Sequence, residues 1–337
     1  MRYLVTGVAG FIGFHVASAL CAAGQQVVGL DNLNDYYEVS LKQARLTQLA
    51  RFPHFHFKQG DLADRATMAA LFASHPFERV IHLGAQAGVR YSIDNPFAYA
   101  DSNLSGMLTV LEGCRQHGIE HLIYASSSSV YGLNDAMPYH TEQRTDHPVS
   151  LYAATKKSGE LMAHAYSALY GLPTTGLRFF TVYGPWGRPD MAIIKFTRAI
   201  LADEPIEVYN HGDLRRDFTY IDDIVAGILA VADQPPSAHP QWQARTSPPA
   251  DSAAPYRLLN IGNGQPVRLL DFIEALEEAL GKPAIKRMVP MQAGDMHATW
   301  ADSEPLHTLT GLRPATPLKQ GIAEFVRWYL AYYQPVR

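Results

Sequence analysis

Short apolar segments alternate with longer amphipathic segments through the first half of the chain. The short segments read as buried strands, and the longer ones carry apolar residues at helical spacing. The pattern predicts strands at residues 3–5, 25–31, 54–61, 79–85 and 121–127, and helices at 14–24, 65–75 and 103–118. Strands that alternate with helices predict an α/β fold with a Rossmann-type, doubly wound parallel sheet, in which ligands bind at the carboxyl ends of the strands.

The turn between the first strand and the first helix contains three glycines at regular spacing, Gly7, Gly10 and Gly13. This spacing is a variant of the dinucleotide fingerprint, in which glycines form the tight turn, admit a pyrophosphate and let the helix pack on the strand. The second strand ends in Asp31, 18 residues after Gly13. A carboxylate there accepts hydrogen bonds from the adenosine ribose and repels a 2′-phosphate. A glycine triplet alone is a weak signal, but the joint pattern predicts an NAD site.

The segment VSLYAATKKSGE, residues 149–160, predicts a helix with Ser150 as its N-cap and with Tyr152 and Lys156 on one face. This pair occurs often by chance, and an ordinary surface helix would also explain it. Four serines, residues 126–129, follow a predicted core strand at the same rim of the sheet. Serine, tyrosine and lysine beside a nicotinamide form a complete set for hydride transfer. We therefore expect Tyr152 to act as a base, with its pKa lowered by the Lys156 ammonium.

Composition and charge narrow the class of protein. Of the 337 residues, 47% are apolar and 18% are charged, which is typical of a globular protein with a large core. The net charge of −4 gives no basic surface for nucleic acid, and no segment approaches the ~18 apolar residues of a membrane span. The two cysteines, Cys21 and Cys114, lack metal-ligand spacing and favour a reducing compartment. Because the first residues read as a strand and not as a signal peptide, we expect a cytoplasmic protein. Because the cysteines lack metal-ligand spacing, we expect no bound metal.

With the glycine spacing, Asp31, the serine run and the Tyr152–Lys156 pair, the chain resembles the extended short-chain dehydrogenase/reductase family over nearly its whole length. It is most similar to the NAD-dependent nucleotide-sugar epimerases and dehydratases. The segments that resemble UDP-glucuronate 4-epimerases are DNLNDYYEVSLKQARL (31–46), HLGAQAGVRYS (82–92), LRFFTVYGPWGRPDMA (177–192) and RRDFTYIDDIV (215–225). UDP-galactose enzymes are less similar, because they usually carry asparagine in place of Thr181.

The resemblance implies NAD-dependent 4-epimerisation of UDP-glucuronate to UDP-galacturonate through a transient 4-keto intermediate, by a homodimer that supplies polysaccharide biosynthesis. It also implies a division of the chain. Residues 1–176 are expected to form the NAD-binding Rossmann domain. Residues 177–337 are expected to form mainly a smaller C-terminal α/β lobe that binds the sugar nucleotide, with the chain crossing between the lobes. Residues 234–256 are rich in proline, serine and alanine, which predicts a flexible surface loop.

The motifs and the resemblance together assign the candidate site residues. The expected catalytic residues are Tyr152, Lys156, Ser127 and Ser128, with the choice between the two serines open. The expected cofactor-binding residues are Gly7, Gly10, Phe11, Ile12, Gly13, Asp31, Asn32, Asp61, Leu62, Leu83, Ala85, Asn103, Ser126, Tyr152, Lys156 and Phe179. The expected substrate-binding residues are Arg90, Ser127, Ser128, Tyr152, Thr181, Arg188, Arg216, Gln292 and Asp295.

The resemblance gives the substrate-binding residues separate roles. It places Arg216 at the UDP diphosphate, where Gln292 replaces a second arginine of some relatives, and Asp295 at the uridine ribose. Thr181 and Arg188 fall where the hexose should lie, and an arginine is the natural partner of the glucuronate carboxylate. A simpler explanation of Arg188 is that it pairs with Asp190, two residues on.

Other functions remain open. A UDP-glucose/UDP-galactose-type 4-epimerase would use the same groups, and a UDP-glucuronate decarboxylase would start from the same ketone, because a 4-keto glucuronate is a β-keto acid. A 4,6-dehydratase usually has an Asp-Glu pair where this chain has Ser128 and Ser129, so dehydration is disfavoured. A non-catalytic NAD-sensing regulator of the same fold is least favoured, because it would be expected to lose Tyr152 or Lys156.

Overall fold

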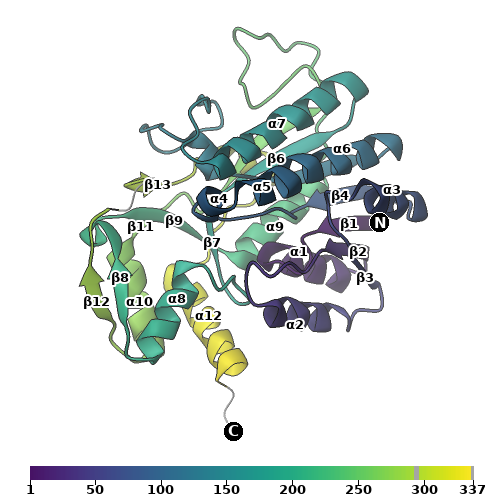
Figure 1. Ribbon diagram of the computed structural model, residues 1–337. Coiled ribbons are helices and arrows are strands. Elements are labelled where there is room, and N and C mark those ends of the chain that lie inside the picture. Colours follow the sequence, from purple (N-terminus) through teal and green to yellow (C-terminus); the bar gives the residue numbers. More distant parts are fainter. Residues whose placement is uncertain (292–295, 335–337) are drawn as a thin grey trace.

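A seven-stranded parallel sheet forms the centre of the computed structural model, which describes residues 1–291 and 296–334 (Figure 1). Its strand order is β10-β6-β5-β4-β1-β2-β3. The strands are β1 (Arg2–Thr6), β2 (Gln26–Asp31), β3 (Phe55–Gln59), β4 (Arg79–His82), β5 (His121–Ser127), β6 (Thr174–Phe179) and β10 (Tyr256–Ile261). Every neighbouring pair is parallel, so all carboxyl ends lie at one edge of the sheet. The predicted doubly wound α/β fold is confirmed.

Helices cover both faces of this sheet (Figure 1). α1 (Phe11–Ala22) packs against α9 (Ile221–Ala232) and α2 (Val39–Leu49), and α6 (Gly106–Gln116) packs against α3 (Arg65–Ser74) and α7 (Leu151–Tyr170). Strand β1 feeds both layers, because Tyr3 and Val5 join the core cluster of α1 and α9, and Leu4 joins the cluster of α3 and α6. Successive residues of a strand point to opposite faces, so a buried parallel strand needs cover on both.

The C-terminal part adds smaller layers beside the carboxyl edge of the sheet (Figure 1). Its elements are β7 (Thr181–Tyr183), α8 (Ala192–Leu201), β8 (Pro205–Val208), η3 (Tyr209–Gly212), β9 (Arg215–Tyr220), β11 (Pro266–Arg268), α10 (Leu269–Leu280), β12 (Ile285–Met288), β13 (Ala298–Thr299), α11 (Glu304–Thr310) and α12 (Leu318–Tyr333). β9 pairs with β7, β11 and β13, and β8 pairs with β12. Between β9 and β11 the chain returns to the large sheet: α9 packs beside it, and β10 forms its edge strand. The division into two lobes at residue 176 stays a prediction.

The predicted helix at 103–118 differs most from the observed chain path. The short helices α4 (Tyr91–Asp94) and α5 (Pro96–Tyr99) lead into a π-helical segment, η1 (Ala100–Ser105), which continues as α6. The helix predicted from residue 14 also begins earlier, at Phe11, directly after the glycine turn. π-Helical turns are rare and occur frequently at functional sites, so η1 draws attention to the residues it carries.

The end of the predicted loop at 234–256 is packed and not free. Ala250 and Ser252 are each only 6% exposed, and His164 of α7 lies 2.8 Å from the Ser252 hydroxyl. Tyr256 is already the first residue of β10.

Among the described residues, no helix combines the length and apolar composition that a membrane span requires.

A buried ion pair fixes α7 to the sheet. Arg178 of β6 donates from Nε and Nη2 to the two carboxylate oxygens of Glu160 at 2.8 and 2.9 Å, and the Ser126 hydroxyl donates to the same carboxylate at 2.7 Å. Glu160 and Arg178 are each only 1% exposed. Burial raises the pKa of the Glu160 carboxyl, but Arg178 offsets this, so the net pKa lies below its usual value. The pair therefore stays charged and joins the ends of β5 and β6 to the helix.

We expect Arg178→Met to lower the free energy of unfolding by about 3 kcal/mol or more, because it leaves the Glu160 carboxylate in the core without its principal counter-charge. Arg115→Met is the matched control, since it removes the same group from the exposed Arg115–Glu112 pair and should cost less than ~1 kcal/mol. Urea denaturation of both variants measures the difference. Equal losses in the two variants would show that the buried pair does not stabilise the fold.

Candidate active site

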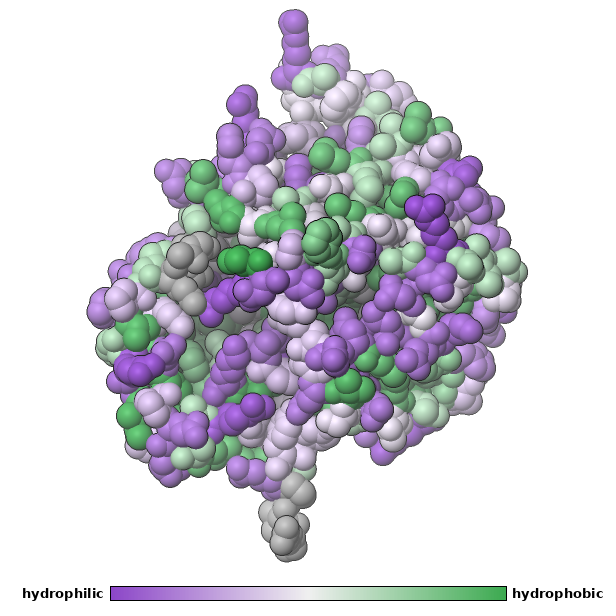
Figure 2. Space-filling view, viewed as in Figure 1, coloured by the Kyte–Doolittle hydropathy of each residue, from purple (hydrophilic) through white to green (hydrophobic). Residues whose placement is uncertain are grey.

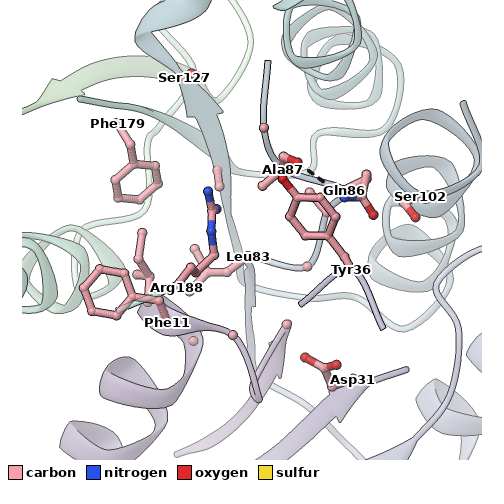
Figure 3. Close-up of a pocket in the computed structure, with 18 of the residues that line it drawn as sticks. Phe11, Asp31, Tyr36, Leu83, Gln86, Ala87, Ser102, Ser127, Phe179 and Arg188 are labelled. Carbon is pink, nitrogen blue, oxygen red and sulfur yellow. Dashed lines mark hydrogen bonds between the residues drawn. The ribbon is translucent and has the colours of Figure 1, made fainter. Parts of the chain in front are cut away.

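One cavity of about 370 Å³ opens at the carboxyl ends of the central strands (Figure 3). Most of the predicted site residues line it: Gly7, Gly10, Phe11, Ile12, Gly13, Asp31, Asn32, Asp61, Leu62, Leu83, Ala85, Ser126, Ser127, Tyr152, Lys156, Phe179, Thr181 and Arg188. Asn103, Ser128, Arg90 and Arg216 are described but are not part of this lining. The structure thus brings together residues from α1, β2, β5, β6, β7 and α7 that are far apart in the sequence.

The glycine turn has the geometry that a dinucleotide phosphate requires. Gly7 has a φ of +69°, which side chains with a Cβ rarely adopt. A Cβ on Gly13 would lie 2.1 Å from the carbonyl oxygen of Gly7, so only glycine lets α1 start this close to the turn. Gly10 is the N-cap of α1, and the free N–H groups of the first helical turn face the cavity side. The residues present fit the diphosphate of NAD.

Asp31 ends β2 at the lower side of the cavity in Figure 3. Its Oδ2 accepts the N–H of Ala9 at 3.1 Å, and its Oδ1 accepts the N–H of Leu33 at 2.9 Å. These bonds hold the carboxylate beside the glycine turn, and its contact with an adenosine ribose stays a prediction. Lys42 of α2, which we did not predict, also lines the cavity and donates to the Asn34 carbonyl at 2.7 Å. Burial lowers the pKa of Lys42, and Asp31 opposes this shift.

Tyr152 and Lys156 lie in the first turns of α7, whose N-cap is Ser150 as predicted. The Lys156 ammonium donates to the Ala125 carbonyl at 2.8 Å and lies 6.0 Å from the centre of the Tyr152 ring. Burial lowers the pKa of Lys156 to about 8. A deeply placed ammonium of this kind is available to bind a ribose hydroxyl of a cofactor in the cavity.

The expected lowering of the Tyr152 pKa by Lys156 is wrong. Burial raises the pKa of Tyr152 above its ordinary value, and the opposing effects come from a hydrogen bond with Ser127 and from the charge of Arg188. The cation that favours the phenolate is therefore an arginine from the loop after β7, and not the lysine one turn along the same helix.

The serine run divides into separate roles. Ser126 donates to Glu160, as described above, and Ser127 lines the cavity next to Tyr152. The Ser127 hydroxyl accepts the N–H of Ser129 at 3.2 Å and donates to the Ser129 hydroxyl at 3.2 Å. Ser128 is the first residue of the 3₁₀ turn η2 (Ser128–Tyr131). Of the two predicted catalytic serines, Ser127 lines the cavity and Ser128 does not, and a catalytic role for Ser127 stays a prediction.

Asn103 lies outside the cavity lining but bonds to two segments that border the cavity. Its Oδ1 accepts the N–H of Gln86 at 2.8 Å, and its Nδ2 donates to the Gln86 carbonyl at 3.1 Å and to the Thr155 hydroxyl at 3.0 Å. The side chain thereby joins the loop after β4 to the helix that carries Tyr152. A direct contact of Asn103 with the cofactor stays a prediction.

Arg188 extends into the cavity between Phe179 and Tyr36 in the view of Figure 3. Its Nε and Nη2 donate to the two carboxylate oxygens of Asp190, each at 3.0 Å, and the Tyr36 hydroxyl donates to the same carboxylate at 3.3 Å. Burial raises the pKa of Asp190, but Arg188 outweighs it, so the carboxyl is ionised at neutral pH. The simpler explanation of Arg188, pairing with Asp190, is therefore observed together with its place in the cavity.

Arg45 joins the glycine turn to the loop that carries Arg188. Its Nη1 donates to the Ala9 carbonyl at 2.7 Å, and its Nη2 donates to the carbonyls of Trp186 at 2.7 Å and Gly187 at 3.2 Å. The residue is fully buried, and none of the ion pairs found in residues 1–291 and 296–334 involves it. The glycine turn and the loop after β7 are therefore bound by the same guanidinium.

The other predicted substrate residues lie outside the cavity or outside the described chain. Arg90 is exposed, and its guanidinium lies 5.6 Å from the centre of the Tyr209 ring in the C-terminal part. Arg216 of β9 donates to the Arg215 carbonyl at 2.9 Å. Gln292 and Asp295 lie outside the described residues.

Sequence reasoning missed several lining residues, above all Tyr36, Lys42 and Gln86. The signal for the cations was present, because Leu41, Lys42 and Arg45 lie on the buried face of α2 with Leu49, and a lysine and an arginine on an apolar face indicate polar partners. Tyr36 gave no such signal, since its place depends on how the loop after β2 folds across the edge of the sheet.

The arrangement has the parts of an oxidoreductive sugar site. A dinucleotide turn, a ribose-binding carboxylate, a hydroxyl next to a phenol, and a half-buried arginine face one space. The first two suit NAD, the next two can move a proton at a sugar hydroxyl, and the arginine can bind an anion.

Comparisons with known proteins agree with this geometry. The family model "NAD dependent epimerase/dehydratase family" matches residues 3–242. The chain is 52% identical over 334 residues to Protein CapI of Staphylococcus aureus, covering 99% of this chain and 100% of that protein. It is 49% identical over 335 residues to the probable UDP-glucuronate 4-epimerase of Rhizobium meliloti (strain 1021), covering 99% and 98%.

A solved structure is similar over nearly the whole length. The crystal structure of UDP-glucuronic acid 4-epimerase from Bacillus cereus, in complex with UDP-glucuronic acid and NAD, superposes with a TM-score of 0.86. The two chains are 32% identical, and the match covers 97% of this chain and 98% of that one. Sequence and fold agree, and this chain belongs to the NAD-dependent epimerase/dehydratase family.

Proposed function

We propose that this protein is a UDP-glucuronate 4-epimerase, which interconverts UDP-glucuronate and UDP-galacturonate with NAD as a bound cofactor. One observation carries the proposal: the Asp31 carboxylate, the Ser127–Tyr152–Lys156 group and Arg188 line a single cavity. The relatives named UDP-glucuronate 4-epimerase support the choice of substrate, because they match this chain over almost its full length.

The first half of the chain holds the cofactor. The glycine turn with Gly7 and Gly13 receives the diphosphate, Asp31 accepts the adenosine ribose hydroxyls, and the Lys156 ammonium binds the ribose next to the nicotinamide. When bound, NAD supplies a positively charged ring that takes up a hydride from C4 of the sugar and later returns it.

Tyr152 and Ser127 move the proton of the sugar hydroxyl. The Tyr152 phenolate accepts the C4–OH proton, and the Ser127 hydroxyl donates a hydrogen bond to the oxygen that becomes the carbonyl. A buried tyrosine loses its proton only when other groups favour the phenolate. Before the sugar binds, the hydrogen bond with Ser127 and the charge of Arg188 act in that direction. For the reverse step Tyr152 returns the same proton, so no proton is consumed over the cycle.

The 4-keto sugar must present its opposite face to the cofactor before the reaction is complete. During this time it is a β-keto acid and loses CO₂ readily when the bond to the carboxylate stands perpendicular to the carbonyl. Arg188 holds the carboxylate out of that alignment through its guanidinium, with the hydroxyls of Thr181 and Ser127 as further partners.

The UDP group lies toward the C-terminal part. Arg216 binds the diphosphate from β9, the strand whose parallel neighbour β7 carries Thr181. Gln292 is assigned to the diphosphate and Asp295 to the uridine ribose by resemblance alone, and Arg90 is the reserve candidate for the carboxylate. These roles rest on the family pattern and on the position of β9 beside the cavity.

The protein acts as a homodimer that pairs through α6 and α7. Leu161, Ala165 and Leu169 form an exposed apolar stripe on α7, and Phe97 of α5 and Leu108 of α6 are exposed apolar residues as well. Figure 2 shows apolar side chains gathered among polar ones over these helices. Exposed apolar residues on two neighbouring helices suit a four-helix contact with a second copy. A cytoplasmic location and a role in polysaccharide biosynthesis complete the proposal.

Product analysis tests the function directly. Wild-type protein incubated with UDP-glucuronate, without added NAD, should form UDP-galacturonate to equilibrium, because the cofactor is regenerated in each turnover. NMR of the products separates the alternatives: UDP-pentose would indicate a decarboxylase, faster conversion of UDP-glucose a UDP-glucose-type epimerase, and no turnover of any of these substrates a regulator.

Tyr152→Phe should lower kcat about 10²-fold or more with little effect on the affinity for UDP-glucuronate, because only the proton-transfer group is removed. Tyr166→Phe is the matched control, since Tyr166 is on the same helix but its hydroxyl bonds to Glu112 away from the cavity. Steady-state kinetics with calorimetric binding measures both quantities. Near-normal turnover in Tyr152→Phe would exclude the proposed base.

Leu161→Glu should convert the dimer to a monomer, because it places a charge in the apolar stripe on α7. Leu312→Glu, an exposed leucine away from these helices, is the control and should leave the mass unchanged. Sedimentation equilibrium reports the mass. A wild type that sediments as one chain, or a Leu161→Glu dimer, would contradict this interface.

A further inference from the structure

The Arg188 guanidinium is already engaged by a carboxylate of the protein itself. Asp190 accepts from both Nε and Nη2 at 3.0 Å in a two-point fork, which is the geometry that an arginine offers to a carboxylate ligand. Both side chains keep about a quarter of their surface exposed, 27% for Arg188 and 26% for Asp190. The pair therefore lies at the wall of the cavity and not in the core.

Asp190 also accepts a longer hydrogen bond from a tyrosine. The Tyr36 hydroxyl donates to its Oδ2 at 3.3 Å, and Tyr36 lines the cavity close to Arg188 in Figure 3. A carboxylate that moves away from Arg188 toward Tyr36 would keep this bond. Tyr36 is therefore a partner for Asp190 that does not depend on Arg188.

A sugar carboxylate and Asp190 compete for the Arg188 guanidinium. Asp190 holds the edge of the Arg188 guanidinium that combines Nε with Nη2. A substrate carboxylate must either displace Asp190 from this edge or bind the end-on Nη1–Nη2 edge, where the negative charge of Asp190 close by weakens its binding. In both cases Asp190 opposes the binding of an anionic sugar.

We propose that Asp190 is a resident competitor that exchanges with the sugar carboxylate at Arg188 and so sets how tightly the carboxylate is held. This inference rests on the proposed function, since it takes the ligand to be a nucleotide sugar with a carboxylate. Asp190 acts through Arg188 and is a positioning residue, which touches no reacting atom.

The exchange answers a requirement of the reaction. The carboxylate must be gripped while C4 is oxidised, released while the ketone turns, and gripped again in a second orientation. A guanidinium that lost its only partner in the turning step would be left unpaired in a half-buried place, which is costly. Asp190 fills that position whenever the sugar leaves it, so release of the carboxylate leaves no unpaired charge.

The test is Asp190→Asn, which keeps the shape and the hydrogen bond to Tyr36 but removes the competing charge. We expect the Kd and KM for UDP-glucuronate to fall about 5- to 10-fold, the effect of losing one nearby like charge at a partly exposed site. The Kd for UDP-glucose should not change. We also expect kcat for UDP-glucuronate to fall, because a tighter grip slows the turning of the ketone.

Three controls make the result specific. Asp190→Glu keeps the charge and should not tighten UDP-glucuronate binding. Asp190→Ser is a second neutral variant, so misfolding of one variant does not decide the question. Glu120→Gln removes one negative charge from an exposed residue at the opposite end of β5 and corrects for the change in net charge. Thermal unfolding and NAD content confirm that each variant is folded.

The outcomes separate this inference from the proposed function. Selective tightening for UDP-glucuronate with reduced kcat supports the exchange. An increase in KM in the neutral variants, or equal changes for UDP-glucuronate and UDP-glucose, would overturn it, because Asp190 would then only orient Arg188. The proposed function fails independently if the wild type does not form UDP-galacturonate at all.

Discussion

The Glu160 carboxylate and the Arg178 guanidinium meet in the core where α7 crosses the ends of β5 and β6. A buried pair of this kind need not add net stability, but any packing that separates the two charges is excluded by its cost. It therefore restricts α7 to one position on the sheet. Lys156 precedes Glu160 by one helical turn, and Ser126, bonded to the same carboxylate, precedes Ser127. The distance between the phenol and the serine hydroxyl follows from this constraint.

A second constraint joins the two halves of the site. Arg45 binds the carbonyl of Ala9 in the glycine turn and the carbonyls of Trp186 and Gly187 in the loop that carries Arg188. A guanidinium that is buried among carbonyl oxygens is stabilised only while all of these carbonyls stay in place. The loop that is proposed to hold the sugar carboxylate is therefore positioned by the same side chain as the turn for the cofactor diphosphate.

The fold and the cofactor half were predictable because their signals are local. Glycine spacing, a strand that ends in Asp31 and the Ser150 cap are each fixed by neighbouring residues, and the structure places them as expected. The π-helical start of α6 and the direction of Tyr36 depend on contacts between distant segments, and no local pattern encodes them. The expected effect of Lys156 on Tyr152 failed for the same reason. Burial depends on the whole fold, and the cation that acts on the phenol comes from residue 188.

That long-range charge links base strength to carboxylate binding. Arg188 lowers the pKa of Tyr152 against the effect of burial, so the net charge around Arg188 affects how readily the phenol gives up its proton. If the sugar carboxylate simply added to the Arg188–Asp190 pair, one more negative charge near Tyr152 would raise its pKa and weaken the base. In an exchange the sugar carboxylate takes the place of Asp190 at the fork and Asp190 moves toward Tyr36, so the guanidinium keeps one directly bonded carboxylate and the rise in the Tyr152 pKa is smaller. The exchange at Arg188 thus lets the enzyme grip and release an anionic sugar while the charge that supports its base changes little.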